Sequence, residues 1–336
     1  KIGVSILANL VLEGHNVTAI DSDADVVREV TDIYDVIGVN GNCVDCETLE
    51  QADVTHAQLF VAVTDSDEEN MLSCFLAKQL GAGHTIARIR NPEYNDHSLG
   101  FMRQKLCLSM SVNPELLTAQ ELYHMLKLPS AVKIEYFSRR SVEMVELRLR
   151  SDSLLNNVAL KDLSWKFKGK YLVCVVQRGD EIHIPDGNFV LQSGDRIHLT
   201  AAPAEIQRLL KAIGVLKKQA RSIMILGGSR TAYYLAKMLL ASGADVKIIE
   251  SDRERCRELC KTLPKAVVIN GDGAQQELLL EEGIESVDAF VALTGMDEEN
   301  ILISYFAMQK NVPKVIAKVN RSEFLSTAEA LGLDSI

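Results

Sequence analysis

The chain contains two copies of one sequence pattern, and this duplication constrains the fold more than any other feature. Asp21 aligns with Glu250 at an offset of 229 residues, and the sequence Asp-Glu-Glu-Asn at 67–70 recurs at 297–300 at an offset of 230. Several separated blocks keep this offset, so a chance match is improbable. The period is far too long for a solenoid, and it predicts a duplicated domain.

Within each copy, short β-branched runs alternate with helical patterns. This order predicts a parallel sheet covered by helices on both faces, a doubly wound Rossmann-like α/β fold. In the first copy we expect helix 4–13, strand 16–21, helix 23–32, strand 36–40, helix 46–52, strand 58–63, helix 67–80, strand 84–89 and a helix near 94–103. The second copy is expected to repeat this order from strand 222–226.

The segment between the copies has a different pattern. Polar and apolar residues alternate at 142–149 and 171–176, and a helical pattern follows at 203–213, which predicts a smaller α+β lobe. Residues 113–128 are expected to form a helix that connects the first sheet to this lobe, and Lys217-Lys218-Gln219 a linker. The expected domains are 1–130, 131–215 and 220–336.

Composition excludes several classes of protein. The 36 basic and 46 acidic residues give a net charge of −10, which argues against a nucleic-acid binder that works by bulk positive charge. No uncharged apolar run approaches the ~18 residues of a membrane helix. Seven cysteines, an odd number in a chain this long, argue against a secreted disulfide framework and favour the reducing cytoplasm.

The second copy carries a variant of the dinucleotide-binding fingerprint. An apolar strand ends at Gly227, and a helix is expected to start directly after the loop, which is the context that the fingerprint requires. Ser229 and Ala232 take its second and third positions. Alanine is accepted at the third position, but Ser229 adds a side chain where a phosphate should come nearest, which counts against binding in this copy.

In the first copy, Gly3 aligns with Ala232 and therefore takes the third fingerprint position. The strand and the two glycines expected before it are missing, so the chain begins in mid-motif. At the other end, Ile336 aligns with Leu106, and the second copy is expected to lack a small lobe of its own.

Acidic residues end the second strand of both copies. Asp21 and Glu250 lie where a carboxylate accepts hydrogen bonds from ribose hydroxyls and repels a 2′-phosphate, which favours NAD(H) or an adenine nucleotide over NADP. The alternative is that each acid only caps the following helix. Matching placement in the two copies favours binding.

Polar loops follow the later strands of each copy. Asn40 and Gly41 in the first copy, with Gly271 and Asp272 in the second, would lie beside an adenosine, although they are also ordinary turn residues. Thr64 and Asp65 precede a helix N-terminus that Ser66 would cap, and Thr294 is the counterpart of Thr64. Four cations near the ends of the next strands could meet phosphates or could simply be solvated: Arg88, Arg90, Lys318 and Arg321.

Catalytic and metal-binding motifs are missing from the sequence. The pairs Cys43/Cys46 and Cys256/Cys260 each lack a second nearby pair of cysteine or histidine ligands, so we expect no zinc site. No Walker loop or nucleophile elbow occurs. We therefore expect a protein that is not an enzyme.

Taken together, these motifs resemble the RCK (KTN) family. The resemblance rests on the Asp21 strand end, the Asn40-Gly41 loop, the stretch 64–70, the sequence Arg-Ile-Arg-Asn-Pro-Glu-Tyr at 88–94, and a lobe with Ile-Pro-Asp-Gly at 184–187 and Leu-Gln-Ser-Gly-Asp-Arg at 191–196. It covers nearly the whole chain. Each motif is weak by itself, and their combination is specific.

The resemblance implies a regulator of potassium transport. It implies a cytoplasmic assembly, commonly a homotetramer, docked at the inner face of the plasma membrane on a Trk-type potassium transporter and responding to NAD(H) or ATP/ADP. The first site would then be formed by Gly3, Asp21, Asn40, Gly41, Thr64, Asp65 and Arg88, and the second by Gly227, Glu250, Gly271, Asp272 and Thr294.

Two alternatives stay open. An NAD-dependent oxidoreductase would fit the sheet and the acidic strand ends, but no acid or base for hydride-transfer chemistry is evident. An RCK module that regulates a potassium channel or an antiporter would share every motif, and only its membrane partner would distinguish it.

Overall fold

The computed structural model describes residues 2–92, 94, 96–127, 131–137, 142–149, 151, 153–179, 181–213 and 220–335. The chain divides into two compact units, Lys1–Leu117 and Thr118–Ile336. No helix in the described ranges combines the length and the apolar character that crossing a bilayer requires.

The second copy forms one parallel sheet, in the order β13-β12-β11-β14-β15-β16. Its strands are β11 (Ser222–Leu226), β12 (Asp245–Glu250), β13 (Val267–Asn270), β14 (Ala289–Ala292), β15 (Lys314–Ala317) and β16 (Asp334–Ser335). The central strands are buried on both faces, as their continuous apolar sequences require. The predicted doubly wound fold is confirmed.

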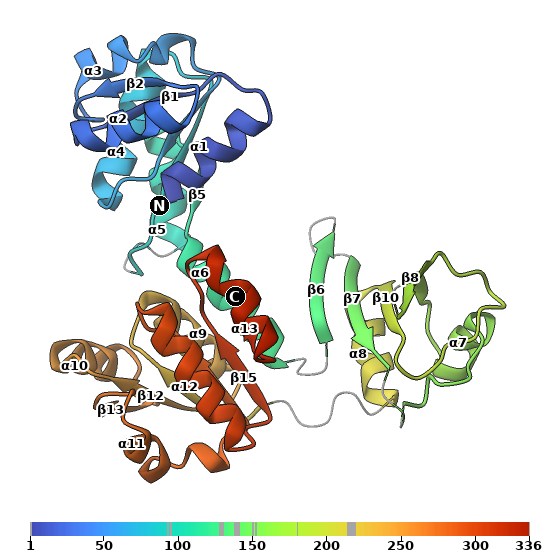
Figure 1. Cartoon of the computed structure of the whole chain (residues 1–336). Helices are drawn as coiled ribbons and strands as arrows, with labels where there is room; N and C mark the ends of the chain where they lie inside the picture. The colour runs from blue at the N-terminus through green and yellow to red at the C-terminus, as the bar shows by residue number, and fades with distance from the viewer. Residues whose placement is uncertain are drawn as a thin grey trace. The chain divides into compact units, whose positions relative to one another are not determined.

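Helices connect these strands (Figure 1): α9 (Arg230–Ala241), α10 (Arg253–Thr262), α11 (Gln276–Glu281), η2 (Ile284–Ser286), α12 (Asp297–Gln309), η3 (Ser322–Phe324) and α13 (Leu325–Ala330). The strand order runs outward from β11 to β13 and then returns to β14 on the other side. Because parallel crossovers are right-handed, α9 and α10 cover one face and α12 covers the other. The carboxyl end of β11 therefore lies at the switch point, where ligands of such sheets bind.

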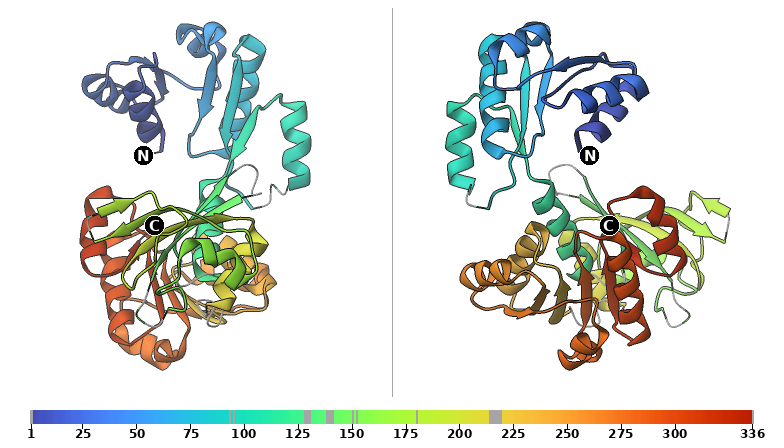
Figure 2. Two further views of the ribbon diagram at one scale, coloured as in Figure 1. Left: turned by 90° about the vertical axis from the view of Figure 1, so that its right-hand side faces the viewer. Right: turned by 60° about the vertical axis from the view of Figure 1, so that its left-hand side comes forward.

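The first copy has the same element order but its strands form two separate parallel sheets, β1-β2 and β3-β4-β5, which appear in blue and teal in Figure 2. Its strands are β1 (Thr18–Asp21), β2 (Ile37–Asn40), β3 (Leu59–Ala62), β4 (His84–Arg88) and β5 (Met110–Val112). Its helices are α1 (Ile2–Leu12), α2 (Ala24–Ile33), α3 (Cys46–Gln51), η1 (Val54–His56), α4 (Asp67–Leu80) and α5 (Asp96–Lys105).

The two sheets of the first copy correspond to the two sides of β11 in the second copy. There β11 pairs with both β12 and β14, whereas no described strand lies between β1 and β3. The two sheets still share an apolar core, in which Ile20 of β1, Val39 of β2 and Phe60 of β3 pack together. The single sheet expected for the first copy is therefore corrected to two sheets in the described residues.

The intervening lobe contains an antiparallel sheet in the order β6-β7-β10-β8-β9. Its elements are β6 (Ala131–Phe137), β7 (Val142–Arg148), α7 (Leu160–Phe167), β8 (Leu172–Arg178), β9 (Glu181–His183), β10 (Arg196–Ala201) and α8 (Pro203–Ala212). The alternating patterns predicted β7 and β8, and the helical pattern predicted α8, but the sequence reading missed the other four. Helix α6 (Pro114–Lys127) matches the predicted connecting helix. The expected linker at 217–219 lies outside the described residues.

Candidate functional site

The first candidate site begins where β1 and β2 end side by side. The Asn40 side-chain amide donates to the backbone carbonyls of Asp21 and Ser22, both at 3.1 Å, and the Gly41 N–H donates to the Asp21 carbonyl at 3.0 Å. Asp21 Oδ1 accepts from the Asp23 N–H at 3.0 Å. The Asp21 carbonyl therefore accepts two hydrogen bonds at this junction, and the second carboxylate oxygen of Asp21 has no protein partner among the described residues.

The second copy builds the same junction. The Asn270 amide donates to the carbonyls of Glu250 and Ser251 at 3.1 and 2.9 Å, and the Gly271 N–H donates to the Glu250 carbonyl at 3.0 Å. Asp272 Oδ1 accepts from the Ala274 N–H at 3.0 Å, so its side chain orders the turn that follows β13. Sequence reasoning placed these residues together correctly but missed the bridging role of Asn270.

The glycine-rich loop of the second copy is tightly packed. Gly227 has φ +92°, and a Cβ there would lie 3.0 Å from the backbone of Leu293 and Thr294. A Cβ at Gly228 would lie 2.8 Å from Glu250 Oε2. Gly227 is therefore required by its backbone conformation, whereas a side chain at Gly228 would have to displace those of Glu250 and Leu259.

Polar side chains of the chain itself already occupy donors of this loop. Glu250 Oε2 accepts from the Gly228 N–H at 2.5 Å, while Oε1 accepts from the Asp252 N–H at 2.7 Å. The Ser229 hydroxyl caps α9 by accepting from the Ala232 N–H at 3.3 Å. The expected obstruction by Ser229 therefore takes the form of helix capping, and Glu250 adds a second competitor for the loop.

Gly3, at the third fingerprint position of the first copy, lies in α1. A Cβ at this position would lie 3.3 Å from Val63 Cγ2, which is tight, so glycine allows α1 to approach the end of β3. This is the packing role expected of the third fingerprint position. Its counterpart Ala232 is fully buried in the second copy.

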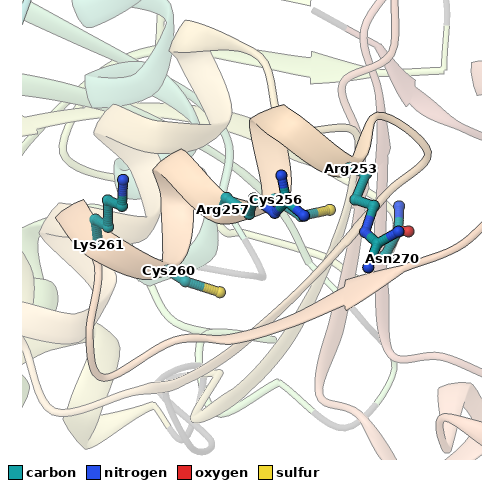
Figure 3. A pocket seen from close by; sticks show the side chains of 6 residues that line it. All are labelled: Arg253, Cys256, Arg257, Cys260, Lys261 and Asn270. Atoms are coloured by element: carbon teal, nitrogen blue, oxygen red, sulfur yellow. The ribbon is translucent and has the colours of Figure 1, made fainter.

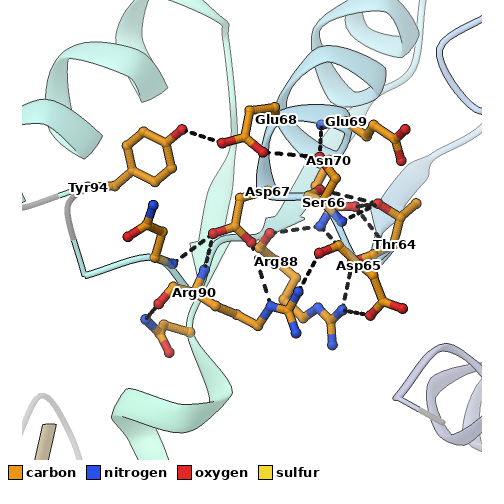
Figure 4. A network of polar contacts seen from close by, with 12 residues as sticks. Thr64, Asp65, Ser66, Asp67, Glu68, Glu69, Asn70, Arg88, Arg90 and Tyr94 are labelled. Atoms are coloured by element: carbon orange, nitrogen blue, oxygen red, sulfur yellow. Dashed lines mark hydrogen bonds and ion pairs between the residues drawn. The ribbon is translucent and has the colours of Figure 1, made fainter. Parts of the chain in front are cut away.

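The other half of the first candidate site lies at the ends of β3 and β4 (Figure 4). The Arg88 guanidinium donates to the Thr64 carbonyl at 2.6 Å and to Asp65 Oδ1 at 3.1 Å. The Arg88 side chain is only 9% exposed, whereas Asp65 is fully exposed. Arg88 Nε is buried without a hydrogen-bond partner in the described structure. Arg88 is therefore a buried, hydrogen-bonded cation at the sheet edge. The alternative interpretation, a solvated surface arginine, does not hold for it.

Two buried residues that sequence reasoning did not single out organise this edge. Asn70 accepts from the Thr64 N–H at 2.7 Å and donates to the carbonyls of Thr64 and Arg88 at 3.1 and 2.9 Å. Asp67 Oδ2 accepts from the N–H groups of Arg90 and Asn91 at 2.8 and 2.7 Å (Figure 4). The recurrence of Asp-x-x-Asn at 67–70 and 297–300 could have indicated these two residues from the sequence. Ser66 caps α4 as predicted, by accepting from the Glu69 N–H at 3.1 Å.

The second copy repeats the hydrogen bonds of this edge, and several carboxylates lie near it. Asn300 accepts from the Thr294 N–H at 3.0 Å and donates to the Lys318 carbonyl at 3.0 Å, in the role of Asn70. Burial, followed by the negative charge of Asp272, raises the pKa of the nearby Glu299 carboxyl, and Glu250 adds to the shift. The negative charges of Asp272 and Glu250 therefore act on Glu299 at this site.

An open pocket of about 620 Å³ lies beside α10 (Figure 3). Its lining residues are Arg253, Cys256, Arg257, Cys260, Lys261 and Asn270. Cys256 Sγ donates to the Glu250 carbonyl at 3.3 Å, so the pocket adjoins the strand-end junction. Burial raises the pKa of the Cys256 thiol, which keeps it protonated at neutral pH and unsuited to nucleophilic or metal chemistry. No cluster of three or more metal-ligating side chains occurs in the described ranges.

The residues present fit an adenosine better than they fit a phosphate chain. Each junction offers a strand-end carboxylate beside a fixed amide and glycine, which suits ribose hydroxyl donors. The glycines of the second copy form a cradle that any Cβ would fill, but Glu250 and Ser229 compete for its N–H groups. In the first copy, Arg88 supplies positive charge at the sheet edge.

Family models match most of the chain. The TrkA-N domain matches residues 1–101 and again 223–336, and the TrkA-C domain matches 144–214. The chain belongs to the TrkA family. This result confirms the RCK resemblance, the repeated Rossmann-like domain and the small lobe of different fold between the copies.

Named members of the TrkA family align over nearly the full chain. The Trk system potassium uptake protein TrkA homolog of Archaeoglobus fulgidus is 34% identical, over 98% of this chain and 74% of its own length. The TrkA protein of Vibrio alginolyticus is 31% identical, over 99% and 73%. The chain thus spans about three quarters of these relatives.

Solved structures agree on the fold. The GsuK RCK domain superposes with a TM-score of 0.70 at 16% identity, over 98% of this chain and 69% of that one. The GsuK channel bound to NAD gives 0.71 at 16% identity, with 57% of the channel chain covered. At this identity, the likeness to RCK structures supports the architecture of this TrkA-family chain and not its ligand.

Proposed function

We propose that this chain is a regulatory subunit of a Trk-type potassium uptake system that binds NAD(H) or an adenine nucleotide and thereby controls a membrane potassium transporter. The observation that carries the proposal is the strand-end junction built twice, with Asp21, Asn40 and Gly41 in one copy and the equivalent residues in the other. The names of its relatives support the potassium system, and the GsuK channel bound to NAD supports the ligand class.

The first site is proposed to comprise Gly3, Asp21, Asn40, Gly41, Thr64, Asp65 and Arg88. The second is proposed to comprise Gly227, Glu250, Gly271, Asp272 and Thr294. In the first, Asp21 would accept from ribose hydroxyls and Arg88 would face anionic groups. In the second, a ligand has to displace Glu250 from the Gly228 N–H, so we expect weaker binding there.

Regulation requires a difference in affinity between two arrangements of the protein. A ligand shifts an equilibrium only by that difference, and ~1–3 kcal/mol of coupling gives a ~5–150-fold effect. We propose that the chain acts from the cytoplasm, at the inner face of the plasma membrane, as a homotetramer. The domains 1–130, 131–215 and 220–336 would be its working units.

The proposal includes that the protein leaves the nucleotide chemically unchanged. The carboxylates at the sheet edge are held by backbone N–H groups, as in Asp67 with Arg90 and Asn91, which suits positioning and not proton transfer. Steady consumption of NADH with a defined co-substrate would instead support an oxidoreductase. Co-purification with a potassium channel or an antiporter would support the other alternative.

The test is thermal unfolding of the purified full chain with NADH, ATP or no ligand. A ligand that binds the folded state at 100 times its Kd stabilises it by about 2.7 kcal/mol, so the melting temperature should rise. Asp21→Ala should reduce the rise, while Asp25→Ala, an exposed residue of α2 whose carboxylate pairs with Arg28, should leave it unchanged. No rise with any adenine nucleotide would overturn the proposal.

A further inference from the structure

The lobe exposes an aromatic residue that no contact in the described structure explains. Trp165 of α7 is the only tryptophan of the chain, and it is 84% exposed. On the opposite side of α7, Leu163 and Phe167 are buried in the core of the lobe. At 100° per residue, Trp165 points directly away from that core. The fold therefore presents this side chain to the outside.

The sequence around this tryptophan is rich in positive charge. Residues 159–171 contain Lys161, Lys166, Lys168, Lys170 and only one acid, Asp162, which gives 4 − 1 = +3 in a chain of net charge −10. All four lysines are exposed. No carboxylate of the described chain forms an ion pair with them. Trp165 and the four lysines are called the α7 face below.

Hydrogen bonds tie the turn after α7 to α8. Lys168 has a left-handed backbone with φ +50°, and its carbonyl accepts from Arg208 of α8 at 3.2 Å. The Lys170 N–H donates to Glu205 Oε2 at 2.8 Å. A Cβ at Gly169 would lie 2.2 Å from the Tyr171 hydroxyl and 2.3 Å from that same oxygen, so a larger residue would have to displace both side chains.

We propose that the α7 face binds an anionic membrane surface. Tryptophan has an apolar body and a polar N–H, which suits the headgroup layer of a bilayer. Lysines near an anionic leaflet add attraction over about a Debye length. The charge on this face is complementary to anionic lipid. Its cations without a carboxylate partner are lysines, since the adjacent Arg208 pairs with Glu205, whereas protein interfaces are enriched in arginine and depleted in lysine. This inference goes beyond the proposed function and does not depend on nucleotide binding.

Because Trp165 is the sole tryptophan, the tryptophan emission of the full chain, excited at the long-wavelength edge where the eight tyrosines do not absorb, reports this site alone. We expect a blue shift of the emission on adding vesicles of phosphatidylglycerol mixed with phosphatidylcholine. Vesicles of phosphatidylcholine alone should give none, and added salt should reverse the shift. Co-sedimentation with the same vesicles measures the partition coefficient independently.

Two triple variants each remove three positive charges, one from the α7 face and the other from α10. Lys161→Gln/Lys166→Gln/Lys170→Gln should weaken partition roughly a hundredfold, since each lysine contributes about fivefold. Arg253→Gln/Arg257→Gln/Lys261→Gln removes three charges from α10, where no tryptophan lies, and should have little effect. Melting temperatures check that both variants fold.

Three results would overturn the proposal. The first is unchanged emission and no sedimentation with anionic vesicles. The second is emission that is already blue-shifted and varies with protein concentration, which would show that a second copy covers the face. The third is a shift produced only by an acidic protein partner in neutral detergent, which would assign the face to a protein interface.

Discussion

Glu250 and Gly228 lie 22 residues apart in sequence and are joined by a 2.5 Å hydrogen bond from the Gly228 N–H to Glu250 Oε2. The other oxygen of the same carboxylate accepts from the Asp252 N–H. The strand-end acid thus ties the glycine-rich loop to the next strand of the sheet. A ligand that binds the loop of this copy has to compete with Glu250 for the Gly228 N–H.

Removing this carboxylate should therefore destabilise the second domain. Glu250→Ala is expected to lower the free energy of unfolding by about 2 kcal/mol, because a hydrogen bond to a charged group contributes ~1.5–3 kcal/mol. Urea denaturation measures the change. Glu254→Ala is the control, since its ion pair with Arg257 is exposed and contributes below ~1 kcal/mol. Equal losses in the two variants would contradict the role assigned to Glu250.

A second prediction compares Gly227 with Gly243, two of the glycines that have a left-handed backbone. Gly227→Ala should cost about 3 kcal/mol, because it combines strain at φ +92° with contacts of 3.0 Å to the backbone of Leu293 and Thr294. Gly243→Ala has φ +82° but meets no atom within 4 Å, so it should cost about 1 kcal/mol. The difference in urea midpoint isolates the packing cost of the loop. Identical midpoints would mean that the close approach has no energetic weight.

A third prediction tests the buried amide beneath the first site. Asn70→Ala should lower the free energy of unfolding by about 3 kcal/mol, because it leaves the Thr64 N–H and the Arg88 carbonyl without partners. It should also reduce any nucleotide-induced rise in melting temperature, since Thr64 and Arg88 lose their support. Asn42→Ala, which removes one exposed turn hydrogen bond to Val44, should cost less than about 1 kcal/mol.

A fourth prediction concerns pH. Burial, then the charge of Asp272, raises the pKa of Glu299 above its ordinary value of 4.5. A raised pKa means that the stabilising contribution is complete below the ordinary value and is lost as pH rises through the folded-state value. Glu299→Gln should therefore stabilise the protein at neutral pH and flatten the decline above pH 4.5, as thermal unfolding over a pH series will show. A variant less stable than the parent at neutral pH would rule out this account.

Most of the fold could be predicted because its signals are local. The period-2 and period-3.6 patterns placed α2, β2 and α4 within a few residues of their observed bounds. The edge strand β9 was missed because its three residues, Glu181–His183, are too short for a pattern. Helix α7 was missed because it is only eight residues long and its apolar residues are interrupted by charged ones, so the helical period is hard to recognise.

The candidate site was only partly predictable. The repeat identified Asp21 and Glu250, since equivalent acids at equivalent strand ends stand out in one sequence. It did not reveal that Glu250 turns back onto the glycine loop, because that contact depends on the exact approach of two chain segments. The same limit hid the bridge from Asn70 to the Arg88 carbonyl.

The sequence by itself determined the duplication, the order of strands and helices, and the acids at the strand ends, because these depend on periodicity and spacing along the chain. Only the tertiary structure decided which polar groups form hydrogen bonds with one another and which stay exposed. Arg88 is buried and hydrogen-bonded, whereas Trp165 and the neighbouring lysines are exposed. Burial and hydrogen bonding arise between segments distant in sequence, and a side chain's role is fixed only when those segments meet.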